Sequence, residues 1–103
     1  MQNSLVNKIK KNISLEDQVI NEAEYLLSNI EYFGDRNLVL GNLTEIEKIA
    51  NDRKIYFINL LELIENNNVT NLTDCLKVMN DNLRKTEEEL KTLKKIANSI
   101  FYC

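Results

Sequence analysis

The chain has 103 residues, of which 44% are hydrophobic and 28% charged, a balance typical of a single folded domain. Its formal net charge of −3 argues against a nucleic-acid binder, which needs a basic face to neutralise phosphates. Because there is no proline and there are only two glycines, we expect long helices and not a loop-rich or all-β fold.

The first predicted helical segment covers residues 3–33, where apolar residues recur at steps of three and four along one face. This stripe consists of Val6, Ile9, Ile13, Ile20, Ala23, Leu27 and Ile30, and its flanks hold Leu5, Val19, Leu26 and Phe33. Only Glu16 interrupts it. Gly34 follows, and we expect it to end the helix in a left-handed conformation.

The start of this first segment has two interpretations. Ser14, followed by Glu16 and Asp17, has the composition of a helix start with a serine N-cap and acidic residues in the first turn. Either one helix runs through the segment, or a short basic amphipathic helix over residues 1–13 is separated from it by a break. We favour the break, within a single helical domain that covers residues 1–103.

The second segment, residues 43–64, carries a wider apolar face. Its main stripe consists of Leu43, Ile46, Ala50, Arg53, Phe57, Leu60 and Ile64. Ile49, Tyr56 and Leu63 widen this stripe on one side, which predicts a helix packed against two neighbours. We expect Arg53 to lay its methylenes on the core and to keep its charged head in water. The preceding residues, 34–42, do not have a helical pattern.

Part of this second segment resembles a known family. The sequence GNLTEIEKIANDRKIYFINLLELIE, residues 41–65, is similar to the central helix of flagellar and type III secretion export chaperones. The resemblance is confined to these residues. It implies a small acidic helical protein that holds a helix of its partner before export.

The third segment, residues 71–102, has the most regular pattern in the chain. Its stripe consists of Leu72, Leu76, Met79, Leu83, Thr86, Leu90, Leu93, Ala97 and Ile100. An asparagine-rich turn at residues 66–68 precedes it. Three stripes joined by short connections predict an all-α, antiparallel three-helix bundle with coiled-coil-like packing and a long third helix.

The residue types needed for catalysis are scarce. The chain has no histidine, which removes the commonest general base and metal ligand, and it has no glycine-rich phosphate loop. Glu62 and Glu65 form a Glu-x-x-Glu turn, but no second acidic pair follows. Cys75 and Cys103 are too far apart on a continuous helix to form a disulfide within one chain. We therefore expect a non-enzymatic protein without a catalytic, cofactor or metal site.

A partner-binding surface is predicted at one end of the bundle. If the third helix is longer than the second, part of its apolar stripe stays uncovered near the turn between the first two helices. The residues that we expect at this surface are Tyr32, Phe33, Leu38, Leu40, Ala97, Ile100, Phe101 and Tyr102.

Two kinds of binding function fit these features. The first is an interaction module, similar to an export chaperone or adaptor, that binds a partner helix or forms a homodimer. The second is a small viral or phage protein that blocks a host protein through its acidic first helix. No segment approaches 18 apolar residues, so we expect no transmembrane helix and a cytoplasmic location, in a bacterium or in a host cell. Membrane-surface binding by residues 1–13 is the least favoured alternative.

Overall fold

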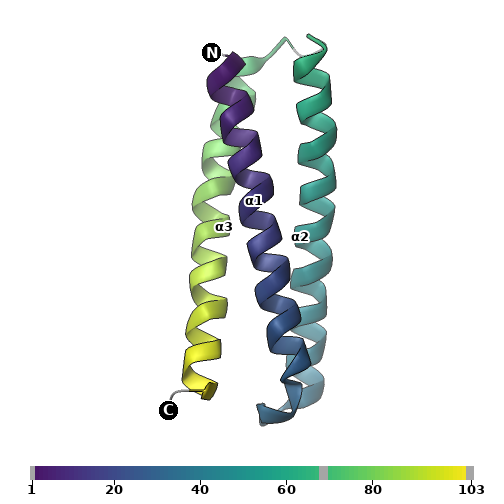
Figure 1. Ribbon diagram of the computed structural model, residues 1–103, viewed down its shortest axis with the longest axis vertical. Coiled ribbons are helices and arrows are strands. Elements are labelled where there is room, and N and C mark those ends of the chain that lie inside the picture. The colour runs from purple at the N-terminus through teal and green to yellow at the C-terminus, as the bar shows by residue number, and fades with distance from the viewer. Residues whose placement is uncertain (1, 68–69, 102–103) are drawn as a thin grey trace.

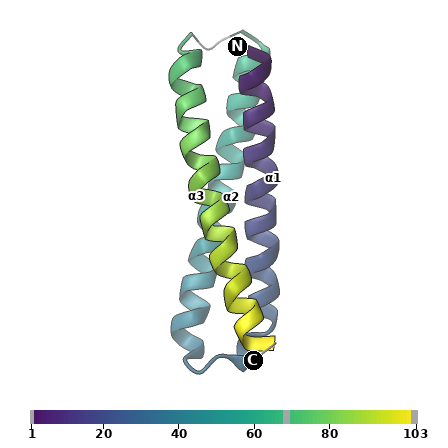
Figure 2. The same cartoon turned by 90° about the vertical axis from the view of Figure 1, so that its left-hand side faces the viewer.

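Three antiparallel helices form a rod of 49 × 20 × 16 Å in the computed structural model, which describes residues 2–67 and 70–101 (Figures 1 and 2). Helix α1 spans Gln2–Ser28, α2 spans Arg36–Glu65 and α3 spans Leu72–Phe101. A short 3-10 helix, η1, covers Ile30–Tyr32. The prediction of an all-α three-helix bundle is confirmed.

The first helix is continuous, so the predicted break between residues 12 and 14 is wrong. The apparent capping residue, Ser14, is exposed. Leu5 and Ile9 on one side of it, and Val19 and Ala23 on the other, are all buried along the same face of α1. A break would move these two groups out of line, and the loss of burial would outweigh the contribution of one capping hydrogen bond.

The predicted irregular region at residues 34–42 is also different in the structure, because α2 begins at Arg36. Asp35 is its N-cap and accepts a hydrogen bond from the backbone N–H of Leu38 at 3.3 Å. Gly34 has no positive φ, so it does not act as a left-handed cap; α1 ends instead in η1. The predicted second turn is confirmed at Asn66 and Asn67, the latter left-handed at φ 58°, while residue 68 lies outside the described residues.

The extra turns of α2 remove the predicted difference in helix length. Helices α2 and α3 have 30 residues each, and α1 has 27. The long third helix therefore has a partner of equal length, and the argument for an uncovered apolar end is wrong in its premise.

Gly41 lies inside α2, where glycine is unfavourable. A Cβ added to it would meet nothing within 4 Å, and its φ is not positive. We expect Gly41→Ala to raise the free energy of unfolding by about 0.5–1 kcal/mol, because alanine loses less backbone entropy in a helix. Gly41→Pro should lower it by about 3 kcal/mol or more. Urea unfolding measures both, and a neutral proline variant would show that this region is not helical.

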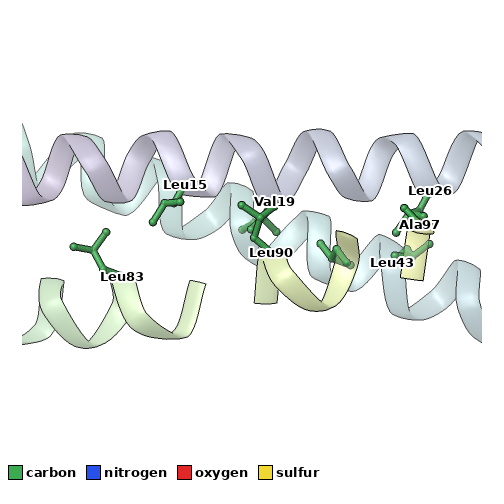
Figure 3. Packing of buried hydrophobic residues seen from close by; sticks show 9 residues of the cluster. Leu15, Val19, Leu26, Leu43, Leu83, Leu90 and Ala97 are labelled. Carbon is green, nitrogen blue, oxygen red and sulfur yellow. The ribbon is translucent and has the colours of Figure 1, made fainter. Parts of the chain in front are cut away.

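The buried apolar residues form two clusters along the rod. The larger cluster, shown in part in Figure 3, comprises Leu15, Val19, Leu26, Leu43, Ala50, Leu83, Leu90, Leu93 and Ala97. The smaller one comprises Leu5, Ile9, Phe57, Ile64 and Met79. Of the buried polar side chains, Asn12 lies between the two clusters along α1, whereas Glu16 and Thr86 lie within the larger cluster.

Helix α1 packs on both of the other helices and lies to one side of them in the view of Figure 2. Its backbone approaches both α2 and α3 closely, whereas α2 and α3 approach each other much less. The predicted packing of the second helix against two neighbours is confirmed, because residues of α2 share both apolar clusters with residues of α1 and α3 and Arg53 pairs with Glu89 of α3. Ile49, Tyr56 and Leu63, which were expected to contact a second neighbour, are exposed.

Candidate functional site

One polar side chain from each helix replaces an apolar one in the core, and the three lie at the same level of the bundle. They are Glu16 of α1, Arg53 of α2 and Thr86 of α3. The Glu16 side chain is 0% exposed, and Arg53 holds it with two hydrogen bonds, Nε to Oε2 at 2.6 Å and Nη2 to Oε1 at 3.1 Å. The expectation that the head of Arg53 lies in water holds only in part, because the side chain is 31% exposed but a buried carboxylate also faces it.

Arg53 also links α2 to α3. Its Nη2 donates to Oε1 of Glu89 at 3.1 Å, and both side chains are about one-third exposed, at 31% and 32%. Two carboxylates thus share one guanidinium, and one negative charge of this group is left unbalanced. We call Glu16, Arg53 and Glu89 the charged layer.

Two asparagines extend the charged layer toward the smaller cluster. Asn82 Nδ2 donates to Oδ1 of Asn12 at 2.6 Å and to Oγ1 of Thr86 at 3.2 Å. Asn12 Nδ2 in turn donates to the carbonyl oxygens of Lys8 at 2.9 Å and of Met79 at 3.2 Å. No buried side-chain nitrogen or oxygen among the described residues lacks a partner. Polar groups can remain in a core when each of them has a hydrogen-bond partner in this way.

The environment shifts the pKa values of the charged layer. Burial raises the pKa of the Glu16 carboxyl above 4.5, although the hydrogen bond and charge of Arg53 partly offset this effect. Burial alone would lower the pKa of Arg53, but its hydrogen bond to Glu16 and the charges of Glu16 and Glu89 outweigh burial and raise that pKa. Glu16 therefore depends on Arg53 for its ionised form.

Two hollows lie between α2 and α3, one on each side of the Arg53–Glu89 contact, and we refer to them together as the groove. Its larger hollow, of about 450 Å³, is lined by Phe33, Val39, Asn42, Leu43, Ile46, Glu89, Thr92, Leu93 and Ile96. Its smaller hollow, of about 140 Å³, is lined by Tyr56, Leu60, Asp74, Cys75, Val78 and Met79. Apart from Glu89, the lining of the larger hollow has no charged side chain.

Exposed apolar side chains border this groove on α2. Asn42 and Tyr56 line the two hollows, and Ile49 and Leu63 follow them at seven-residue spacing, which places all four on one side of the helix. Ile49, Tyr56 and Leu63 are 42%, 61% and 46% exposed. We call the groove together with these three residues the α2–α3 face.

The structure describes only part of the predicted end surface. Tyr32, Leu38 and Leu40 are exposed, and Phe33 lines the larger hollow. Ala97 is buried in the larger cluster and is not available to a partner. Side chains of Ile100 and Phe101, and Tyr102 as a whole, lie outside the described residues, as does Cys103. Helix α3 is continuous from Leu72 to Phe101, and Cys75 carries a free, half-buried thiol.

Sequence reasoning missed the charged layer, although each of its helices gave a signal. Glu16, Arg53 and Thr86 are the single polar residues in three otherwise apolar stripes. Of these three residues, Glu16 and Arg53 pair directly, whereas Thr86 accepts a hydrogen bond from Asn82.

No family model matches the chain, and no curated protein or solved structure is significantly similar to it. Within the described part of the chain, no helix is both long and apolar enough to span a membrane. The same residues contain no cluster of three or more side chains suited to hold a metal ion.

Proposed function

We propose that this protein is a non-enzymatic interaction module that binds a helix of a protein partner along its α2–α3 face. One observation carries the proposal: α2 and α3 both pack on α1 but leave an apolar groove between themselves. A helix laid in this groove would contact α2 and α3 and complete a four-helix arrangement.

The exposed residues beside the groove support this proposal. Isolated apolar residues on a surface are ordinary, but Ile49, Tyr56 and Leu63 form a row that continues the groove lining. An amphipathic helix recognises such a row through its own residues at three- and four-residue spacing. The resemblance of residues 41–65 to a chaperone helix points to the same helix, α2, as the binding element.

Substitutions on two sides of α2 test the location. The ligands are helical peptides selected from a display library for binding to the wild-type protein. We expect the double variant Ile49→Lys and Tyr56→Lys to bind these peptides about a hundredfold more weakly or worse, because the lysines would be buried under the bound helix. Fluorescence anisotropy measures the dissociation constants, and circular dichroism checks that the variant stays folded.

Ile55 provides the matched control. It lies on the same helix and is 50% exposed, close to the 42% of Ile49, but it does not border the groove. Ile55→Lys should leave binding within about twofold of the wild type. Equal losses from both sets of substitutions, or no loss from either, would show that peptides bind elsewhere.

A further inference from the structure

The charged layer limits which helix the α2–α3 face can take. Glu89 lines the larger hollow and is one-third exposed, so a bound helix would remove much of its remaining contact with water. Arg53 already pairs with Glu16 as well as Glu89. A helix that is apolar all along its contact face would leave this excess negative charge desolvated, which is strongly unfavourable.

Nearby cations do not balance the charge. Lys85 lies one turn before Glu89 on α3, yet within the described chain no ion pair joins them. A lysine placed N-terminal to a glutamate is also the weaker order for a pair at this spacing. Lys54, on α2 next to Arg53, pairs with Asp17 of α1 at 2.6 Å.

We infer that the partner of the α2–α3 face is an amphipathic helix with a single lysine or arginine in its otherwise apolar contact stripe, placed to pair with Glu89. This inference rests on the proposed function and specifies its ligand. Apolar residues of the helix would fill the hollows on both sides of the charged layer, and the one basic residue would fix its axial position. A single buried polar residue sets alignment in the same way in coiled coils.

A second copy of this chain fits less well. Two copies joined through the same face would bring two such charged layers together, each with an unbalanced negative charge. The chain as a whole also carries a net charge of −3, which disfavours self-association. A separate, basic helix meets neither difficulty.

A peptide panel tests this inference at pH 8, where carboxylates are ionised. The probes are amphipathic peptides of about 28 residues, which as helices span about 42 Å, with leucine and isoleucine in the contact stripe. One stripe position at a time is changed to lysine, glutamine, norleucine or glutamate. We expect lysine at one central position to bind about tenfold more tightly than norleucine or glutamine there, and glutamate to bind more weakly still.

Variants of Glu89 show whether that preference comes from the charged layer. In the Glu89→Gln variant, the peptide with a central lysine should bind no more tightly than the one with glutamine. In the Glu89→Lys variant, the peptide with a central glutamate should bind most tightly. Glu88→Gln is the matched control, since it removes the adjacent, exposed carboxylate of α3 and should leave the preference unchanged.

The outcomes separate this inference from the proposed function. Tight binding of all peptides regardless of the central residue, or a preference for glutamate on the wild type, would overturn the basic-helix assignment and leave the proposed function standing. Failure of every peptide to bind would overturn both. Analytical sedimentation of the protein alone tests whether a second copy of the chain occupies the α2–α3 face. A stable dimer that Tyr56→Lys dissociates would assign the face to a second copy and overturn the inference.

Discussion

Arg53→Met is expected to lower the free energy of unfolding by about 3–5 kcal/mol at neutral pH, because it leaves the fully buried Glu16 carboxylate without its cation. Methionine keeps much of the apolar stem of arginine, so the loss reports the guanidinium more than lost packing. Urea unfolding followed by circular dichroism measures it. Lys54→Met, which removes the partner of the half-exposed Asp17, is the control and should cost no more than about 1 kcal/mol.

The same variant should become more stable in acid. Without Arg53, the burial that already raises the Glu16 pKa acts with less opposition, so the folded pKa rises further above 4.5. Between 4.5 and that folded pKa the folded state holds a proton that the unfolded state has lost. The contribution of Glu16 to the free energy of unfolding therefore falls as pH rises, by up to about 1.4 kcal/mol per pH unit, and is constant outside this window. Adding Glu16→Gln should abolish the slope; a slope that survives it would have another origin.

Replacing both partners should reverse most of the loss. We expect Glu16→Leu combined with Arg53→Met to have a free energy of unfolding within about 1 kcal/mol of the wild type, or above it, since a well-packed apolar layer often equals or exceeds a buried ion pair. The recovery of several kcal/mol relative to Arg53→Met alone is a coupling that urea unfolding measures directly. A double variant as unstable as the single one would show that Arg53 acts through something other than Glu16.

Much of the fold could be predicted because apolar spacing alone determines it. Helix α3, whose stripe alternates without a slip, lies within one residue of its predicted range among the described residues. The start of α2 could not be predicted because residues 34–42 do not have a helical apolar pattern. In the structure the side chain of Asp35 caps the helix, and Gly41 is simply tolerated inside it.

The row of α1 that the sequence predicts to face the core lies one position along the chain from the row that is fully buried in the structure. Counting apolar residues favoured the row of Val6, Ile13, Ile20 and Leu27, which contains no polar residue. The fully buried row is Leu5, Asn12, Val19 and Leu26. Because Asn12 finds partners on α3, the row that contains it can face the core, and no count along one helix reveals partners on another.

The α2–α3 face could be recognised only in part. The width of the stripe on α2 was visible in the sequence, but width does not say whether a neighbour within the chain or a partner covers it. That depends on how closely α2 and α3 approach each other, which their packing on α1 determines.

The unequal burial of Glu16 and Arg53 also determines the order in which the two residues can be replaced during evolution. Glu16→Leu as a first step leaves Arg53 one-third exposed and still paired with Glu89, so water and a carboxylate continue to solvate its charge. Arg53→Met as a first step strands a carboxylate that has no contact with water. A lineage can therefore exchange this ion pair for apolar residues only by losing the acid before the base, and an intermediate that retains Glu16 without Arg53 would be removed by selection for folding.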